Sequence, residues 1–504
     1  MSSLLGSVSG VLLLAGSAYA GPDGGVVNAG SAGIAGQGSA GVVVTQSSDR
    51  VVIDWNNFDT KSNEAVQFNQ PGSGSIALNR ITSGSPTQFE GSLKANGNVV
   101  LVNPNGVVFG AGSHVDVNGL IATTADIGND RFMEDAKPVF DKSGNPGAKI
   151  VNNGQLTAKE AGLVGFVAPN VVNNGTIEAN LGKVHLASGD SFTLDLYGDG
   201  LVAVKASDAI QTQLGQNSGI IHTSGGKIQI TAAEAKNSVD ALVLNNGILN
   251  ASSATQSGGT IILGGSGPKA RIVASGTIRA AGTLGGTIHV LGKTVEVKQV
   301  NIDASGTTQG GMIRIGGGKQ GGENIARANM TSVDSASTIK ADATHNGNGG
   351  SVVVWSDEYT EYNGHISAKG GTEGGNGGFA ETSGKNTLSV TGSVDTSAAD
   401  RSAGTWLLDP TNITLYNRSQ PGTDNVNTFT TSYLETQSAS TNISLVADTN
   451  LTLDLTGDTL TLANNRNISL TATNGYITSN SAGTITASGT GGITLTAGSN
   501  ISFG

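Results

Sequence analysis

The feature that most constrains this chain is a short pattern that recurs along most of its length. From about residue 150, a turn that contains Asn or Gly is followed by an apolar residue, a small residue and another turn. A second series alternates with the first, and its glycines, each followed by a strand-forming run, lie 33, 27, 25 and 39 residues apart. Recurrence at roughly 20–30 residues with only short strands indicates a solenoid. The glycines of the second series are Gly226, Gly259, Gly286, Gly311 and Gly350.

Composition favours a solenoid built from strands. The 504 residues include 76 Gly, and only 13% are charged, whereas typical proteins have about 7% Gly and about 25% charged residues. Val, Ile, Leu and Thr recur throughout, which argues against a flexible linker or a charged disordered segment. We predict an all-β parallel β-helix with about three short strands per coil, apolar side chains stacked on the next rung, and Gly or Asn at corners with positive φ. At about 25 residues per coil, residues 50–504 give roughly 18 coils, and residues 21–50 are expected to cap the first one.

One turn stands out within the N-terminal part. Residues 101–110 read LVNPNGVVFG, in which Asn103, Pro104, Asn105 and Gly106 separate two runs of strand-forming residues. Proline presets φ for the second position of a β-turn, and Asn and Gly tolerate the conformations that follow. The segment therefore predicts a strand, a tight turn and a second strand.

The residues around this turn resemble a known family. Upstream lie VIDWNNFDT at 52–60, Leu78-Asn79-Arg80 and GSLKANG at 91–97, and GLIATT follows at 119–124. In this order they resemble the N-terminal secretion domain of the filamentous haemagglutinin family, over residues 21 to about 260. Two later segments, ETSGK at 381–385 and WLLDP at 406–410, resemble the region that follows this domain in high-molecular-weight adhesins.

The resemblance implies a right-handed β-helix that is exported as one partner of two-partner secretion. It implies recognition in the periplasm by the POTRA domains of a dedicated outer-membrane transporter, and release at the surface of a Gram-negative bacterium. Residues 103–106 are then the expected secretion motif, with Leu78, Asn79 and Arg80 as a supporting segment. The motif could contact the transporter or hold the local fold, and the sequence leaves both open.

The first 20 residues read as an export signal. An apolar run ends at Ala18-Tyr19-Ala20, which predicts cleavage between Ala20 and Gly21. The first basic residue is Arg50, so we expect an incomplete basic region at the start. No other segment qualifies as transmembrane. The expected division is 1–20 signal peptide, 21–260 secretion domain with a short helix or excursion at 126–149, 261–354 β-helix stalk, 355–415 Gly-rich transition region, and 416–504 repeats that we expect to be truncated.

The sequence shows no catalytic constellation. None of the six histidines has metal-ligand spacing, and we expect them at the surface, with His289 pointing outward between Ile288 and Val290. A net charge of −11 with scattered Lys and Arg disfavours nucleic acid as a partner. Without Cys, a secreted chain must gain stability from a long core, and the resemblance implies that the chain stays threadable through a pore. We expect no catalytic residue, no metal and no cofactor.

Three functions remain open at this stage. The first is a secreted adhesin or structural exoprotein that binds a receptor or glycan on a host or neighbouring cell. The second is a toxin-delivery stalk of a contact-dependent system. The third is a carbohydrate-cleaving β-helix enzyme, which an acidic cluster with a basic neighbour on one coil face would favour.

Overall fold

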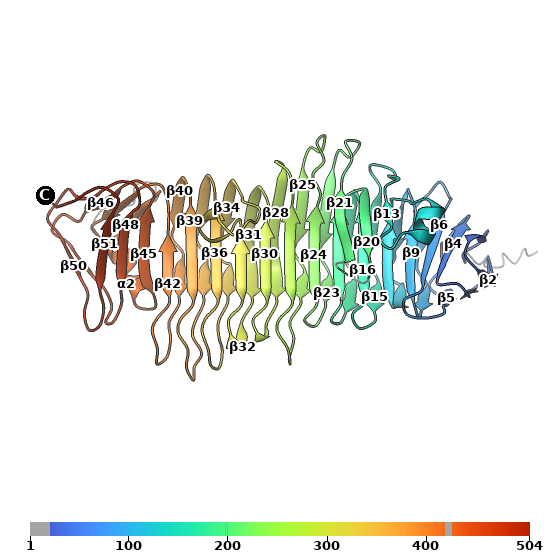
Figure 1. Cartoon of the computed structure of the whole chain (residues 1–504), viewed down its shortest axis with the longest axis horizontal. Coiled ribbons are helices and arrows are strands. Elements are labelled where there is room, and N and C mark those ends of the chain that lie inside the picture. The colour runs from blue at the N-terminus through green and yellow to red at the C-terminus, as the bar shows by residue number, and fades with distance from the viewer. Residues whose placement is uncertain (1–20, 197, 199, 419–425, 504) are drawn as a thin grey trace, which may run out of the picture.

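The computed structural model describes residues 21–196, 198, 200–418 and 426–503. They form a rod in which short strands stack along one axis (Figure 1). The first of two long sheets has 17 strands, and all of them pair in parallel except β1. This confirms the parallel β-helix, with slightly fewer coils than the roughly 18 expected, because excursions lengthen some coils. The strands of the first sheet are β1 (Val26–Ala29), β4 (Arg50–Trp55), β6 (Ile76–Ile81), β9 (Asn98–Val102), β12 (Gly119–Thr123), β16 (Leu163–Ala168), β19 (Lys183–Ser188), β24 (Lys227–Ala232), β27 (Thr260–Gly265), β30 (Thr287–Leu291), β33 (Met312–Ile315), β36 (Ser351–Ser356), β39 (Phe379–Gly384), β42 (Thr405–Leu408), β45 (Asn442–Ala447), β48 (Ile468–Ala472) and β51 (Ile493–Ala497).

The second long sheet has 23 strands and supplies the other two strands of most coils. One coil, for example, runs through β16, then β17, then β18, which confirms about three strands per coil. The strands of the second sheet are β2 (Ala32–Ala35), β3 (Gly41–Gln46), β5 (Ala65–Asn69), β7 (Thr87–Phe89), β8 (Ser92–Ala95), β10 (Gly106–Phe109), β11 (His114–Val117), β14 (Lys149–Asn152), β15 (Gln155–Ala158), β17 (Asn170–Asn173), β18 (Thr176–Ala179), β22 (Gln213–Asn217), β23 (Ile220–His222), β25 (Ala241–Asn245), β26 (Ile248–Asn250), β28 (Ala270–Arg279), β31 (Thr294–Asp303), β34 (Met330–Val333), β35 (Thr338–Lys340), β37 (Tyr359–Tyr362), β38 (His365–Ser367), β40 (Thr387–Val390) and β41 (Ser393–Asp395).

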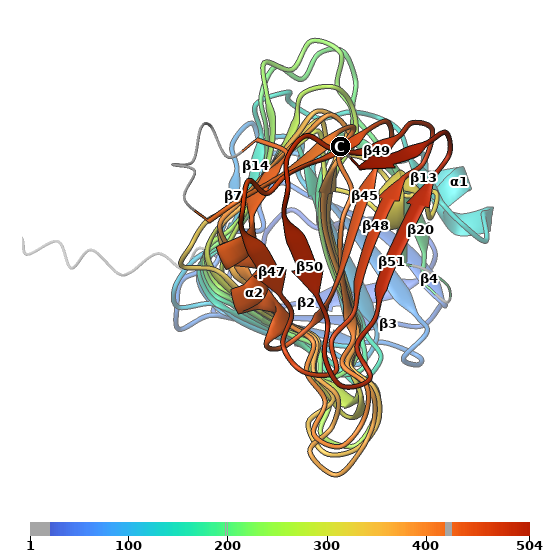
Figure 2. The ribbon, with the colours of Figure 1, turned by 90° about the vertical axis from the view of Figure 1, so that its left-hand side faces the viewer.

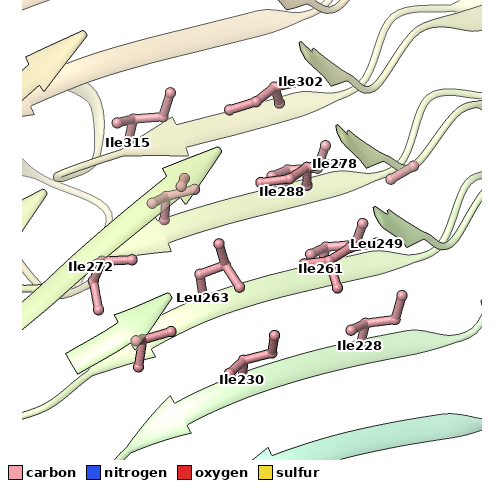
Figure 3. Packing of buried hydrophobic residues seen from close by; sticks show 14 of the residues in the cluster. Ile228, Ile230, Leu249, Ile261, Leu263, Ile272, Ile278, Ile288, Ile302 and Ile315 are labelled. Carbon is pink, nitrogen blue, oxygen red and sulfur yellow. The ribbon is translucent and has the colours of Figure 1, made fainter. Parts of the chain in front are cut away.

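Alternation of apolar and polar residues in each strand aims one set of side chains into the rod. Ile228, Ile261, Ile288 and Ile313 are Cα partners on consecutive strands and are fully buried, so they form one interior column. Figure 3 labels the first three of them. The N-terminal coils add an aromatic column with ring centroids 5.3–6.4 Å apart. Each rung thus buries its apolar side chains against its two neighbours, as in other solenoids. The aromatic column consists of Trp55, Phe58, Phe89, Phe109 and Phe166.

Some corners between strands differ from the expectation of positive φ, whereas Gly106 and Gly276 meet it. Gly175, Gly219 and Gly247 do not have positive φ. A Cβ at Gly175 would lie 2.1 Å from the carbonyl oxygen of Gly154 on the previous coil, so close approach between coils requires glycine here. Beside them, buried asparagines donate from one amide to the next at 2.7–2.8 Å along the rod. This asparagine ladder consists of Asn152, Asn173, Asn217 and Asn245.

The first rung is capped, as the sequence predicted. β1 pairs antiparallel with β4, and β2 pairs antiparallel with β3. The open edges of the first parallel strands are therefore covered by strands of opposite direction, which blocks further pairing at this end.

An excursion covers the outer face of the first sheet near the N-terminus, where a short helix or an excursion was predicted within residues 126–149. Helix α1 (Asn129–Glu134) lies on this face (Figure 2) with the small sheet of β13 (Val139–Phe140), β20 (Ser191–Asp195) and β21 (Gly200–Lys205). The rings of Phe140 and Phe192 stack with their centroids 4.6 Å apart. Both residues belong to a second buried cluster that includes Leu78 and Phe132.

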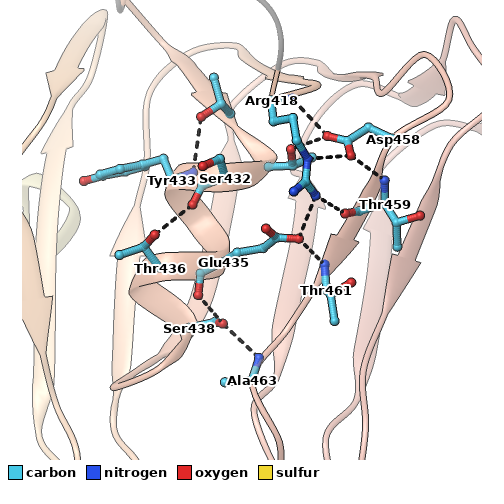
Figure 4. A network of polar contacts seen from close by, with 12 residues as sticks. Arg418, Ser432, Tyr433, Glu435, Thr436, Ser438, Asp458, Thr459, Thr461 and Ala463 are labelled. Carbon is cyan, nitrogen blue, oxygen red and sulfur yellow. Dashed lines mark hydrogen bonds and ion pairs between the residues drawn. The ribbon is translucent and has the colours of Figure 1, made fainter.

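The C-terminal part contains a helix that the sequence did not predict. After β42 the coils use a five-stranded sheet, and α2 (Thr431–Ser438) occupies one side of the coil. The side chain of Thr430 caps the helix by accepting a hydrogen bond from Tyr433 N, and Leu434 is fully buried. Arg418 links Glu435 of α2 to Asp458 of the next coil (Figure 4). The remaining strands of this part are β43 (Ile413–Tyr416), β44 (Thr428–Thr430), β46 (Leu451–Asp454), β47 (Thr459–Thr461), β49 (Ile477–Ser479), β50 (Thr484–Thr486) and β52 (Ile501–Phe503). In the middle of the rod, β29 (Gly282–Leu284) and β32 (Gly306–Gln309) form a separate two-stranded sheet.

Across the described residues, no helix is both long and apolar enough to cross a membrane.

Candidate functional site

The turn at residues 103–106 forms a corner between the two sheets. β9 belongs to the first sheet and β10 to the second, and Gly106 N donates to Asn103 O at 2.9 Å. The predicted strand, tight turn and strand are therefore present, although the two strands do not pair with each other.

Asn103 is fully buried at this corner. Its side-chain amide donates to Ser85 O at 3.1 Å and to Thr87 Oγ1 at 3.0 Å, and its Oδ1 accepts from Asn105 N at 2.9 Å. Because the amide has partners on the previous coil and within the turn, Asn103 fixes the shape of the corner and its position on the coil before it.

Pro104, Asn105 and Gly106 attach the same corner to both neighbouring coils. Asn105 is half-buried, donates to Ser83 O at 3.0 Å and accepts from the Asn145 side chain at 2.5 Å. Pro104 O accepts from Asn145 N at 2.9 Å. Gly106 has φ 113°, and a Cβ there would lie 2.3 Å from Lys149 O, so only glycine fits.

The segment 78–80 lies beside this corner, because Arg80 and Val102 are Cα partners on β6 and β9. Leu78 belongs to the outer cluster beneath α1, and Asn79 is buried and accepts a hydrogen bond from Trp55 Nε1 at 3.0 Å. Arg80 donates from Nε to both Asp126 oxygens at 3.0 Å and from Nη1 to Asp54 at 2.7 Å. Burial opposes its charge, but the two carboxylates raise the pKa of Arg80. This segment therefore joins the β-helix to the excursion that covers it.

The predicted cleavage site falls at the edge of the described chain. Ala20 lies outside the described residues. Gly21 is buried in the cap, where a Cβ would lie 2.1 Å from Ser39 O.

The expectation that the histidines lie at the surface is wrong for His185. It is buried on the outer face of β19, and its Nε2 lies 2.8 Å from Thr231 Oγ1. Burial, followed by the charge of Lys227, lowers the pKa of His185 to about 4. His289 is half-buried, and burial followed by the charge of Arg314 lowers its pKa. The covers over the first sheet could not be read from strand alternation, so the sequence did not show this burial.

A second buried polar site lies under residues 316–328, here called the strap. The strap contains the 3₁₀ turn η1 (Lys319–Gly321) and packs on Trp355 of β36. Glu381 of β39 is fully buried and accepts from Gln320 N at 3.0 Å. Burial raises the pKa of Glu381 to about 8. Arg314, buried at the base of the strap, pairs with Glu323 at 2.6 Å.

A row of projecting loops along the middle and C-terminal coils was also not predicted. These loops, here called the ridge, connect the second sheet to the first and stack on one another (Figures 1 and 2). Each loop is narrowed at its base, where a glycine N–H donates across the loop to a carbonyl at 2.7–2.8 Å. In the sequence, the signal that could have predicted the ridge is an alanine followed some residues later by two glycines. The donor–acceptor pairs are Gly259 to Ala251, Gly286 to Ala280, Gly311 to Ala304, Gly350 to Ala341, Gly378 to Ala368 and Gly404 to Thr396.

Within the parts of the chain that the structure describes, no group of three or more His, Asp or Glu side chains is placed to hold a metal ion.

Comparison with known proteins places this geometry among secretion domains. Residues 18–280 match the family model described as the TPS secretion domain, where TPS denotes two-partner secretion. A heme/hemopexin-binding protein of Haemophilus influenzae strain Rd is 35% identical over 218 residues, which are 42% of this chain and 23% of that protein. A second H. influenzae protein of the same name is 30% identical over 252 residues, 44% of this chain and 26% of that protein.

A solved structure agrees with these matches. The HMW1 secretion domain from H. influenzae superposes with a TM-score of 0.67 at 31% sequence identity, covering 77% of this chain and 100% of that one. The chain spans about a quarter of the length of the two heme/hemopexin-binding relatives.

Proposed function

Because the chain belongs to the family of exoproteins with a TPS secretion domain, which are secreted across the outer membrane of Gram-negative bacteria, we propose that its N-terminal coils act both as secretion signal and as the first folded unit. In this proposal the POTRA domains of an outer-membrane transporter receive the chain in the periplasm. Residues 103–106, with Leu78, Asn79 and Arg80, maintain the part of the domain that is needed for export.

The antiparallel cap carries this proposal. It ends the β-helix on one side only, so the first parallel coil offers a single free edge, on which the next coil pairs. Stability in such a rod is close to a sum over neighbouring rungs. Coils that emerge from a transporter one after another can therefore fold in order on the part already folded, and this folding would favour outward movement.

For the exported rod we propose a surface-attachment role, as an adhesin without catalytic activity. The rod presents the ridge along its side, and the ridge offers a long repeated surface to another molecule. Bacteria that express the chain with its transporter should adhere to target cells more than bacteria that lack the chain. Equal adherence of the two strains contradicts the adhesin role and leaves the export role intact.

The export role is tested by measuring the protein in the medium with and without the transporter gene. Export should require the transporter and should fall strongly in N103A, because the corner loses its buried amide. N105A separates the two roles of the motif, since Asn105 is half-buried and its loss disturbs the corner less. If N105A folds normally and is not exported, the motif contacts the transporter. Export without any transporter contradicts the proposal.

A further inference from the structure

An open groove of about 710 Å³ runs along one side of the ridge, between the ridge and the second sheet. Its floor is a single column of side chains that are Cα partners on consecutive strands from β23 to β35. With about 4.8 Å between rungs, the five rungs span roughly 19 Å. The groove therefore suits an extended molecule that lies along the rod axis. The column consists of His222, Asn250, Arg279, Asp303 and Lys340.

The opposite wall is formed by the ridge and is rich in hydroxyl groups. Ser252, Ser305, Thr307 and Thr344 line it. The described residues of the groove include no Phe, Tyr, Trp, Leu, Ile, Val or Met. A protein segment usually needs an apolar pocket for a buried anchor side chain, so the lining does not favour a peptide. Many closely spaced hydrogen-bonding groups suit a ligand that is itself covered with hydroxyl groups.

The acidic groups of the groove already have protein partners. Asp303 accepts from Ser305 N at 2.9 Å and pairs with Arg279 Nε at 3.2 Å. Asp342 accepts from Ser367 Oγ at 2.6 Å and from Lys369 N at 2.7 Å. Both carboxylates are thus held by hydrogen bonds of the rod itself.

The basic groups, in contrast, have unused donors. Lys340 is exposed, and within the described part of the chain its ammonium has no hydrogen-bond or ion-pair partner. Arg279 is 53% exposed and pairs with Asp303 through Nε. Among the described residues its two terminal nitrogens donate no hydrogen bond, so they are available to a ligand. Guanidinium and ammonium groups bind carboxylates through charge-assisted hydrogen bonds, which are stronger than neutral ones. The groove is therefore prepared for negative charge, although the whole chain carries a net charge of −11.

We propose that this groove binds an extended oligosaccharide that bears carboxylate groups. Arg279 and Lys340, two rungs apart, contact the carboxylates, and Asn250 with the hydroxyl-bearing wall contacts the sugar hydroxyls. Asp303 and Arg279 also form the pair of an acidic and a basic residue that a carbohydrate-cleaving enzyme would use. Because Asp303 and Asp342 are engaged by the rod, the proposed activity is binding without bond cleavage. The proposal rests on the surface-attachment role proposed above and names its ligand class.

The purified full chain is tested on an immobilised array of oligosaccharides of four or more sugars, in which each carboxylated member is paired with its methyl ester. Carboxylated members should bind. Their esters should bind at least about ten-fold more weakly, or not at all. K340A should weaken binding to a similar extent. The K340A substitution removes a side chain without partners among the described residues. The melting temperature of the K340A chain should therefore equal that of the wild type.

Arg271 provides a matched control for Arg279. Both lie on β28, both are about half exposed, and each pairs with an acidic residue of β31, but Arg271 lies outside the groove. R279A should bind the carboxylated members about ten-fold more weakly than the wild type. R279K should retain part of the affinity, and R271A should bind as the wild type does.

Several results overturn the groove proposal: no carboxylated member binds, esters bind equally well, R271A loses as much as R279A, or shortened sugars appear. Cell attachment separates this proposal from the adhesin role. If the K340A chain loses array binding and attachment while R271A keeps both, both proposals gain support. If K340A keeps full attachment, the adhesin role stands and the groove proposal falls. If the wild type binds the array and does not attach to cells, only the adhesin role falls.

Discussion

The two asparagines of the corner at residues 103–106 differ in burial and in the number of neighbours they hold. Asn103 is enclosed and its amide serves the previous coil and the turn, whereas Asn105 is half-buried and links two loops near the surface. A single sequence motif thus contains one residue that the fold requires and one that remains partly accessible.

N103A should lower the free energy of unfolding by about 2–3 kcal/mol, because buried groups lose their partner. N105A should lower it by less than about 1 kcal/mol, since water can replace the lost contacts. Denaturant unfolding of the purified chain, with hydrogen exchange of residues 98–109, measures both. Equal costs for the two variants would contradict the different roles of the two side chains.

His185 predicts a loss of stability in acid. Its pKa is about 4 in the folded chain and 6.5 ordinarily, so between these values the unfolded chain binds more protons. The stabilisation is fully present above pH 6.5 and is lost as the pH falls to about 4, by roughly 3 kcal/mol in total. H185Q, whose side chain does not titrate, should lose less stability between pH 7 and pH 4. Identical pH profiles of wild type and H185Q would show that His185 is accessible to protons in the folded chain.

At the scale of elements, the ridge depends on glycines that no other residue can replace. At Gly285 a Cβ would lie 2.0 Å from the carbonyl oxygen of Ala304 on the next coil. G285A should therefore open the base of its own loop and of the adjacent loop of the ridge. The free energy of unfolding should fall by about 2 kcal/mol or more. Hydrogen exchange at residues 280–311 should rise. Gly84 is a matched control, because it is exposed and a Cβ there would meet nothing within 4 Å; protection lost equally in G84A would point to a general effect of added side chains.

The strap should loosen in base. The buried Glu381 has a pKa of about 8 against an ordinary 4.5, so the folded chain binds the additional proton between these values. Stability is highest below pH 4.5 and falls as the pH rises to about 8, by up to roughly 4–5 kcal/mol. Trypsin can cut the strap after the exposed Lys319 and Arg327. Cleavage of the wild type relative to E381Q should increase from pH 7 to pH 9, and a constant ratio would contradict this account.

For the whole molecule, the cap decides whether the rod has a free sheet edge at its start. Deletion of residues 24–37, which contain β1 and β2, would expose the edges of β3 and β4. Exposed parallel edges pair with other chains, so the purified deletion variant should form dimers or larger species in light scattering. V26S is the control, because Val26 is 58% exposed and its backbone pairing remains. A deletion variant that stays monomeric would show that the edges are protected in another way.

The sequence by itself determined the repeat, the all-β class, the cap, the corner at residues 103–106 and the family. These features depend on local turn chemistry and on alternation within short strands, which are written in neighbouring residues. A local rise in charged residues also marked residues 126–149 as a short helix or an excursion from the regular coils.

Tertiary structure alone decided which distant residues meet. Arg80 reaches Asp126 over 46 residues, and His185 and Glu381 are buried by segments that fold back over the first sheet. The groove column joins residues at sequence spacings of 28, 29, 24 and 37. Loop lengths vary from coil to coil, so no fixed period marks these positions. Only the hydrogen-bonded register of the sheets aligns them, because each coil must place its apolar side chains on those of the coil before.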